Sequence, residues 1–380
     1  MKVGFIIPNL LPYGGNSGTV LKYIRQASKV CDEVVLFQSY KFSSPDQYPL
    51  DYIQSLKNVK VVTLSIPWYK VVDATRNIPY GFLIHYSLYH IYVASRKVAN
   101  YRKLKIAEGL DGIYSFDFVD TNIFPVKNLP IIVGTHNQKM SFFKVLASNY
   151  GILLRKASGI RLFNSEEQYV SLFKGKTARV IPKGVDTELF FPRSEGANQK
   201  VKFLYVARLE PRKGLDILLD AWEDSKGWEF GELNIVGTGS IESLARDTKL
   251  KSVIYHGPLY DKELQKLYRL CDVFVFPTQW DAQPSVVVEA VSSGLLVLCS
   301  DYLRGAFDDF EKEGFLEYVE NKGGKLSKWI KKYGESFSSN FEIRQEMHNY
   351  VDKNRSQKHE VEEILIFLKE LKSSLYTPIT

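Results

Sequence analysis

Short apolar runs alternate with helical segments along most of this chain, and this alternation limits its fold more than any other feature. An apolar run at 3–7 leads into a loop, a helical stretch and a second apolar run at 34–37. Apolar runs without polar alternation are typical of strands that are buried on both faces. Two such strands joined through a helix form a βαβ unit, so we predict parallel sheets with helices on both faces.

The alternation stops at 180–200 and then restarts, which divides the chain. This segment contains Pro182 and Pro192 and ends in a polar stretch without apolar periodicity, so we interpret it as a linker. We therefore predict an α/β protein of two doubly wound, Rossmann-like domains, residues 1–180 and 181–359, that face each other across a cleft. A final helix at 360–380 is expected to pack back on the first domain. The remaining buried strands are expected at 59–64, 112–115, 131–134, 159–164, 202–206, 232–236, 252–256, 273–276 and 296–299.

The composition is that of an ordinary globular protein. With 45% hydrophobic and 24% charged residues among 380, it excludes disordered, collagen-like and coiled-coil chains. The three cysteines, Cys31, Cys271 and Cys299, are far apart and odd in number, which favours a reducing compartment. Pro8 interrupts the apolar start, which we predict to be a strand rather than a signal peptide. Since no apolar segment reaches about 20 residues, we expect no membrane span. With the cysteines, this leads us to expect a cytoplasmic protein.

The net charge of +7 is unevenly distributed along the chain. Residues 1–180 contain 23 Lys and Arg against 11 Asp and Glu, a balance of +12, whereas residues 181–380 contain 27 against 32, a balance of −5. The basic half is compatible with nucleic acid, an anionic membrane or a phosphorylated small molecule as a partner. Composition does not distinguish these three classes.

The first candidate site is the loop 12–18, between the first strand and the first helix. Gly14 and Gly15 let backbone amides approach an anion at the helix N-terminus. Neither the complete G-x-G-x-x-G pattern nor G-x-x-x-x-G-K-[ST] is present. A Gly-Gly pair of this kind forms a tight turn about as often as a ligand loop.

Three cations follow the strand expected at 202–206. Arg208, Arg212 and Lys213 lie within six positions at the expected start of a helix. Cations there oppose the helix dipole unless an anion is bound. The planar guanidinium of Arg208 and the point charge of Lys213 suit a diphosphate. The alternative is a solvated charge cluster paired with Glu210 and Asp216.

The segment 279–290 is the most specific stretch of the sequence. Asp281 lies in a loop after the strand expected at 273–276, and Ser285 is predicted to be the N-cap of the next helix. Glu289 lies one turn into that helix among valines, where a carboxylate needs a hydrogen-bonding partner such as a pair of sugar hydroxyls. The alternatives are a partly exposed helix residue for Glu289 and a turn former for Asp281.

Taken together, these motifs resemble a known family. The pattern Arg208-x4-Lys213-Gly, followed by Asp281-x7-Glu289, resembles the donor site of retaining GT-B glycosyltransferases of the group 1 class, family GT4. The likeness covers essentially the whole chain, because further motifs of the family are similar to residues 181–190 (IPKGVDTELF), 235–239 (IVGTG) and 255–257 (YHG).

The resemblance implies a role for each matched residue. Arg208 and Lys213 would hold the diphosphate of a nucleotide-sugar, Glu289 the ribose and Asp281 the sugar hydroxyls. The amides of Ser285 and Val286 would bind the phosphates, and Gly237 and Leu259 would flank the base. His136 would contact the donor sugar. Gly14 and Gly15 would lie near the distal phosphate and the acceptor. Two positions depart from the family: Asp281 replaces the usual Glu, and Lys183 replaces the usual Asn.

The resemblance also implies an activity. It predicts transfer, with retention, of a hexose-type sugar from a UDP- or GDP-linked donor to a glycan or lipid-phosphate-linked acceptor. No D-x-D motif occurs, which agrees with metal independence, and no cofactor is expected. The alternatives are a nucleotide-sugar epimerase of GT-B fold and a nucleotide-sugar-binding protein without catalysis.

The segment 68–105 combines aromatic and basic residues. Seven aromatic residues lie between Trp68 and Tyr92, and five Lys or Arg residues follow at 96–105. This combination suits an anionic membrane surface, so we expect peripheral attachment on its cytoplasmic face. The alternative is an amphipathic helix on the first sheet with solvated basic residues. Single-stranded nucleic acid would also fit, but no nucleic-acid module accompanies the segment, so no such partner is expected.

Overall fold

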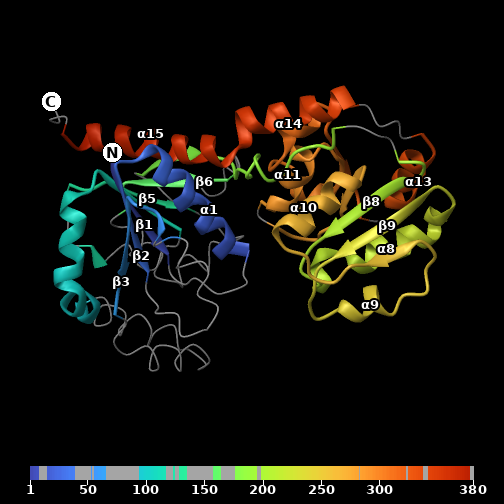
Figure 1. Cartoon of the computed structure of the whole chain (residues 1–380), viewed down its shortest axis with the longest axis horizontal. Helices are drawn as coiled ribbons and strands as arrows, with labels where there is room; N and C mark the ends of the chain where they lie inside the picture. Colours follow the sequence, from blue (N-terminus) through green and yellow to red (C-terminus); the bar gives the residue numbers. More distant parts are fainter. Residues whose placement is uncertain are drawn as a thin grey trace. The chain divides into compact units, whose positions relative to one another are not determined.

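In the computed structural model, the described part of the chain forms two compact units, each with its own parallel sheet (Figure 1). The N-terminal unit comprises Met1–Ile181 and Glu360–Thr380, and the C-terminal unit comprises Pro182–His359. The described residues are 1–7, 15–38, 53, 55–65, 94–116, 123–124, 128–134, 157–163, 176–194, 198–281, 283–321, 324–336 and 341–376.

The sheet of the N-terminal unit has the strand order β3-β2-β1-β4-β5-β6-β7, and all its strands are parallel. The order reverses beside β1, which has β2 on one side and β4 on the other, as in doubly wound folds. The strands are β1 (Lys2–Ile7), β2 (Glu33–Gln38), β3 (Val59–Thr63), β4 (Gly112–Ser115), β5 (Ile131–Gly134), β6 (Gly159–Leu162) and β7 (Thr177–Val180).

Apolar side chains of this sheet are buried on both faces. One buried cluster joins alternate residues of the strands to helices α1 (Gly15–Val30) and α15 (Gln357–Tyr376). A second cluster on the other face includes residues of the segment 104–110, which contains the 3-10 helix η1 (Lys105–Gly109). Gly159 allows α15 to approach the sheet, because a Cβ there would lie 2.6 Å from a methyl carbon of Leu371.

The sheet of the C-terminal unit has the order β10-β9-β8-β11-β12-β13, again all parallel. Its strands are β8 (Val201–Val206), β9 (Gly231–Val236), β10 (Val253–Tyr255), β11 (Val273–Phe276), β12 (Leu296–Ser300) and β13 (Leu316–Val319). Its helices are α8 (Leu215–Asp224), α9 (Glu242–Arg246), α10 (Asp261–Leu270), α11 (Ser285–Ser292), α12 (Asp308–Lys312), α13 (Lys325–Ser336) and α14 (Phe341–Arg355), with 3-10 turns η5 (Pro211–Lys213), η6 (Gly227–Glu229) and η7 (Asp301–Leu303).

The predicted fold class, two doubly wound parallel-sheet units, is confirmed. The predicted linker is wrong for residues 182–194, which belong to the C-terminal unit. Val185 and Phe190 are buried in its core, and Arg193 forms an ion pair with Asp272 at 2.9 Å. These buried contacts hold the segment, although its prolines and polar residues lack the periodicity of a helix or strand.

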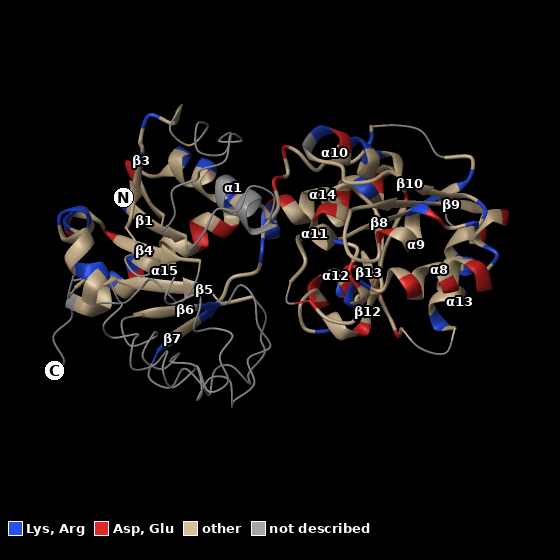
Figure 2. Ribbon diagram, turned by 90° about the horizontal axis from the view of Figure 1, so that it is seen from below, with Lys and Arg blue, Asp and Glu red and all other residues tan. Residues whose placement is uncertain are grey.

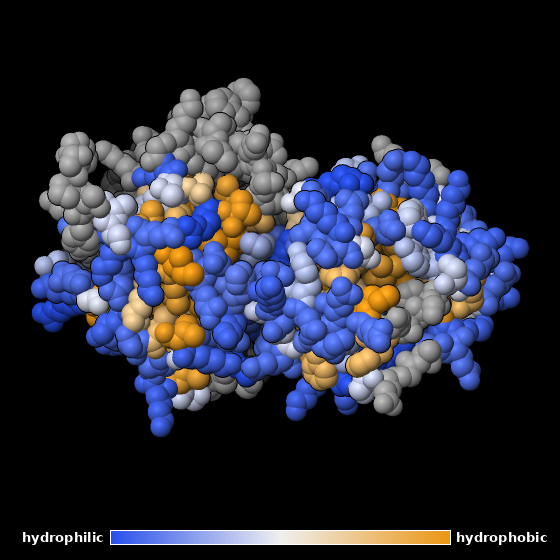
Figure 3. All heavy atoms as spheres, turned by 90° about the horizontal axis from the view of Figure 1, so that it is seen from above, coloured by the Kyte–Doolittle hydropathy of each residue, from blue (hydrophilic) through white to orange (hydrophobic). Residues whose placement is uncertain are grey.

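No helix within the described ranges combines the length and the apolar character that a membrane crossing requires. On each unit, the surface in view in Figure 3 carries many hydrophilic residues and smaller patches of hydrophobic ones.

Candidate functional site

Two loops that carry predicted site residues begin at the point where the strand order of the C-terminal sheet reverses. β8 and β11 are neighbours, and the sheet continues through β9 on one side and through β12 on the other. In doubly wound sheets, ligands bind outside the carboxyl ends of the strands at such a point. The segment 207–214 follows β8 and the segment 277–284 follows β11.

Lys213 and Asp281 form an ion pair that joins these two loops. The Lys213 side chain is 8% exposed and the Asp281 side chain 22% exposed. Burial lowers the pKa of Lys213 below its usual value of 10.5, and the charge of Asp281 opposes that change. A partly desolvated ammonium interacts strongly with an incoming anion, because little water screens it.

Backbone contacts hold the two loops together independently of that ion pair. Gly214 has a φ of 73°, and a Cβ there would lie 2.0 Å from the carbonyl oxygen of Pro277, so only glycine fits. The N–H of Gln279 donates to the carbonyl of Arg212 at 2.8 Å. The separation between the cation and the carboxylate is therefore set by the backbone as well as by their charges.

Arg208 is the exposed cation of the site. Its side chain is 68% exposed, and its guanidinium lies 2.7 Å from Glu210. Glu210 also pairs with Arg212, whose guanidinium lies over the ring of Trp280 at 5.4 Å from the ring centre. Arg208 and Arg212 therefore both pair with Glu210, as expected for the alternative of a solvated charge cluster. Lys213, however, pairs with Asp281 and not with Asp216.

The cations lie immediately before a helix, as predicted. The helix α8 begins at Leu215, and Gly214 in the left-handed conformation is its N-cap. Arg212 and Lys213 form the short 3-10 turn η5 with Pro211. The accessibility of Arg208 and the desolvation of Lys213 are the features that favour an anion here.

The helix α11 presents Glu289 but starts differently from the prediction. Ser285 is the first helical residue, whereas Pro284 occupies the N-cap position and no side chain caps the helix. Glu289 is 8% exposed, so it is not a partly exposed helix residue. The Tyr268 hydroxyl lies 3.3 Å from its carboxylate and supplies the hydrogen bond that burial requires. Val286 is half-buried against the core.

Gly237 and Leu259 follow β9 and β10. Gly237 has a φ of 137°, and a Cβ there would lie 1.8 Å from the carbonyl oxygen of Ala207, the residue before Arg208. Its N–H donates to the Gly257 carbonyl at 2.9 Å. Leu259 is half-buried against the core. Gly237 thus lies beside the loop of Arg208, as a residue near the same ligand would.

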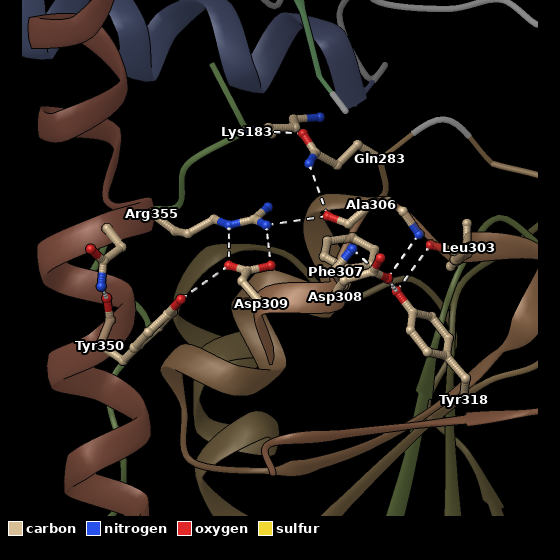
Figure 4. Close-up of polar contacts among 12 residues, drawn as sticks. Lys183, Gln283, Leu303, Ala306, Phe307, Asp308, Asp309, Tyr318, Tyr350 and Arg355 are labelled. Carbon is tan, nitrogen blue, oxygen red and sulfur yellow. Dashed lines mark hydrogen bonds and ion pairs between the residues drawn. The ribbon is translucent and has the colours of Figure 1, made fainter. Parts of the chain in front are cut away.

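Gln283 was not identified from the sequence, yet it supports the loop that carries Asp281. It is 5% exposed, and its side-chain oxygen accepts the backbone N–H of Lys183 at 2.7 Å. Its amide nitrogen lies 3.4 Å from the Ala306 carbonyl, which also accepts from Arg355 at 3.2 Å (Figure 4). Lys183 replaces the Asn that is usual in the family. This replacement is compatible with the contact, because only the backbone N–H of Lys183 takes part. The sequence shows only a glutamine two residues after Asp281, and its burial is seen in the structure alone.

The chain passes between the units close to this contact. Val185 and Ser356 form a parallel bridge, and the Val185 N–H donates to the Arg355 carbonyl at 2.9 Å. Arg355 also forms an ion pair with Asp309 of α12 (Figure 4). Gln283 therefore links the Asp281 loop to the place where the chain enters and leaves the C-terminal unit.

Several predicted residues are not placed by the structure. His136, Gly14 and the segment 66–93 lie outside the described residues, and Gly15 is the first residue of α1. The expectation that Arg96 is a solvated or membrane-facing charge is wrong, because this side chain is buried at 1% exposure. Basic and acidic positions are interspersed along the helices of the C-terminal unit (Figure 2).

Comparison with known proteins agrees with the resemblance to group 1 glycosyltransferases. Residues 186–353 match the family described as Glycosyl transferases group 1. Sulfoquinovosyl transferase SQD2 of Arabidopsis thaliana is 29% identical over 159 residues, which are 38% of this chain and 30% of that protein. The chain thus spans well under half the length of this relative.

Solved structures resemble the whole chain. Sucrose-phosphate synthase from Thermosynechococcus elongatus has a TM-score of 0.71 at 16% identity, covering 98% of this chain and 99% of its own. HepE of Anabaena, in complex with UDP-glucose, has a TM-score of 0.68 at 17% identity, covering 97% of this chain and 100% of its own.

Two doubly wound units, with charged loops at the point of strand reversal, define a GT-B fold. Residues 186–353 match the group 1 glycosyltransferase family, which confirms the resemblance to that class drawn from the motifs.

Proposed function

We propose that this protein is a retaining glycosyltransferase that moves a hexose-type sugar from a UDP- or GDP-linked donor to a glycan or lipid-phosphate-linked acceptor. The observation that carries the proposal is the pairing of buried Lys213 with Asp281 beside the exposed Arg208, at the point of strand reversal in a group 1 domain. The complex of HepE with UDP-glucose supports a nucleotide-sugar as the donor.

The arrangement suits the departure of a nucleoside diphosphate. As the bond between the anomeric carbon and the diphosphate oxygen breaks, negative charge grows on that oxygen. Lys213 and Arg208, held by the backbone contacts of their loop, would stabilise this charge. Because the ammonium of Lys213 already lies in a desolvated position, little reorganisation is needed when the charge develops. In this proposal the two cations supply the charge that a metal ion supplies elsewhere.

The remaining groups would act on the sugar and the acceptor. Asp281 would hold sugar hydroxyls while it shares Lys213 with the diphosphate. The proposal assigns His136 to the donor sugar, and Gly14 and Gly15 to the distal phosphate and acceptor. The acceptor oxygen bonds to the anomeric carbon on the face that the diphosphate leaves. The acceptor proton passes to the departing phosphate oxygen, which conserves the anomeric configuration.

The decisive test is binding of nucleoside diphosphates and their sugars. We expect UDP-glucose, GDP-mannose or a related ribonucleotide sugar to raise the melting temperature of the full chain. The gain should disappear in Arg208→Ala and Lys213→Ala and persist in the control Arg246→Ala, an exposed arginine of α9 that pairs with Asp247. The absence of a shift with UDP-, GDP-, ADP- and TDP-sugars would refute the proposal.

Product analysis separates the transferase from the two alternatives. Incubation with the donor that binds, followed by NMR of the products, should show a new glycoside with the donor's anomeric configuration. Interconversion of the donor sugar without transfer would identify an epimerase. Tight binding without turnover, tested against glycan and lipid-phosphate acceptors, would identify a binding protein.

We also propose a peripheral location on the cytoplasmic face of a membrane. Within the described part of the segment 68–105, Val98 is 79% exposed, Tyr101 is 57% exposed, and the Lys105 ammonium lies 5.2 Å from the centre of the Tyr101 ring. An aromatic ring beside a lysine suits the headgroup region of an anionic bilayer. Co-sedimentation with phosphatidylglycerol vesicles at low salt is expected, and should weaken in Tyr101→Ser. Failure to co-sediment at any salt concentration would refute this location.

A further inference from the structure

Glu289 has one polar side-chain partner among the described residues, and that partner comes from a different helix. Tyr268 of α10 places its hydroxyl 3.3 Å from Oε2 of Glu289 and 3.4 Å from the Val286 carbonyl. No described residue hydrogen-bonds Oε1 of Glu289. The carboxylate therefore has one oxygen engaged by the protein and one oxygen available to a ligand.

The Tyr268 side chain is held rigidly. It is fully buried, and the Phe190 ring packs edge-on against it at 5.4 Å between ring centres. The centre of the Phe274 ring of β11 lies 6.0 Å from the centre of the Tyr268 ring. Burial raises the pKa of Tyr268 well above its usual value of 10, so the hydroxyl keeps its proton and acts as a donor. A fixed donor restricts the rotation of the carboxylate to which it binds.

We infer that Tyr268 is a positioning residue that orients Glu289 toward the ribose hydroxyl pair of the donor, so that the site selects ribonucleotides over 2′-deoxyribonucleotides. The inference rests on the proposed function, in which Glu289 holds the ribose. A carboxylate can accept from both hydroxyls of a ribose only when its plane and free oxygen face them. Without the Tyr268 hydroxyl, Glu289 would keep its charge but lose that orientation.

Binding of matched nucleotide pairs tests this inference. The dissociation constants of UDP and 2′-deoxy-UDP, with the GDP pair in parallel, are measured by calorimetry for the unmodified protein and for Tyr268→Phe. A hydrogen bond to a charged group changes affinity by about tenfold or more, so the unmodified protein should prefer the ribonucleotide by at least that factor. Tyr268→Phe should reduce the preference to about threefold or less, mainly by weakening the ribonucleotide.

A matched control shows whether any buried tyrosine has this effect. Tyr318 is also buried in the C-terminal unit and donates to a carboxylate, that of Asp308, at 3.1 Å. Tyr318→Phe should therefore lower the melting temperature without changing the ribose preference. Glu289→Gln changes the acceptor of the same hydrogen bond. It should abolish the preference for ribonucleotides, and it can be measured even if Tyr268→Phe does not fold.

The outcomes separate the inference from the proposed function. If the unmodified protein binds neither nucleotide pair, the proposed function fails and the inference fails with it. If it prefers ribonucleotides and Tyr268→Phe weakens both members of a pair equally or leaves both unchanged, the inference alone is overturned. A selective loss of ribonucleotide affinity supports it.

Discussion

Arg161 in the N-terminal unit and Lys213 in the C-terminal unit are both buried cations paired with a carboxylate, yet their surroundings differ. Arg161 is fully buried, as is its partner Glu360 of α15. Its guanidinium also donates to the Ile181 carbonyl at 2.8 Å and to the hydroxyls of Tyr23 and Tyr114 at 2.7 and 3.0 Å. By contrast, the Asp281 carboxylate that pairs with Lys213 is 22% exposed.

The difference teaches how to distinguish structural from functional charges in this fold. The protein itself surrounds Arg161 with partners and excludes solvent, so its charge stabilises the attachment of the C-terminal helix α15. Among the described residues, Lys213 pairs with one carboxylate, which is partly exposed to solvent, so a ligand can join the pair. Removing the first cation should therefore affect folding, and removing the second should affect binding.

The largest expected effect is that of Arg161→Met on folding. Loss of one partner of a buried ion pair leaves an uncompensated charge on Glu360, so the free energy of unfolding should fall by about 3–5 kcal/mol. Urea denaturation measures this loss. The control is Arg179→Met on the neighbouring strand, whose partly exposed partner Glu370 also lies on α15; its loss should stay below about 1 kcal/mol. Equal losses in the two variants would contradict the distinction.

Lys213→Met should give the opposite result. Because burial makes the charged form of Lys213 unfavourable, its replacement should change the free energy of unfolding by about 1 kcal/mol or less. Affinity for the nucleoside diphosphate should fall by about 1.5–3 kcal/mol, the strength of hydrogen bonds to charged groups. Denaturation and calorimetry on the same sample measure both quantities. A variant that unfolds readily and binds normally would show that Lys213 is a structural charge.

Gln283→Leu should have an intermediate effect, which lowers both the free energy of unfolding and kcat. It removes the acceptor of the Lys183 N–H, and the lost hydrogen bond should cost about 1 kcal/mol of unfolding free energy. Because the loop of Asp281 is then less well held, kcat for sugar transfer should fall more than KM for the donor rises. Gln283→Glu keeps the acceptor oxygen for the Lys183 N–H but loses the donor to the Ala306 carbonyl, so it should recover only part of kcat. A loss of stability with unchanged kcat would limit Gln283 to a structural role.

The smallest expected effect is the pH dependence that arises from Lys213. Since its pKa lies below the usual 10.5, nucleotide affinity should weaken as pH rises through that lowered pKa, before an ordinary lysine would deprotonate. Over the same range, the unfolded chain binds more protons than the folded one, so this group's contribution to stability should rise with pH. Calorimetry between pH 7 and about 10 measures the affinity. Lys213→Arg, which stays charged, should show no alkaline weakening; a parallel decline in both proteins would exclude Lys213 as its source.

The periodicity of the sequence predicted much of the fold because strands buried on both faces are continuous apolar runs. The bounds of β11 coincide with the predicted strand at 273–276. β7 and β13 were not predicted. β7 (TARV) forms an edge of the sheet and its residues are exposed or half-buried, so it lacks the continuous apolar run that burial on both faces produces.

The candidate site was predicted in its residues but not in its connections. The local signals at Arg208, Lys213 and Asp281 consist of charges and glycine after strands, which a sequence displays directly. The contacts that join Lys213 to Asp281, Gln283 to Lys183 and Tyr268 to Glu289 span 68, 100 and 21 residues of sequence. No local pattern encodes such pairings, because they depend on which strand ends are neighbours.

The sequence by itself therefore determined the fold class, the resemblance to group 1 glycosyltransferases and the residue types available for binding a diphosphate. It also showed that residues 1–180 carry +12 and residues 181–380 carry −5. Only the tertiary structure decided that Arg96 and Arg161 are buried, that Lys213 is desolvated against Asp281, and that Tyr268 reaches Glu289. The physical reason is that the consequences of a charge depend on its solvent exposure and its partners, and both are set by packing between segments that are distant in the chain.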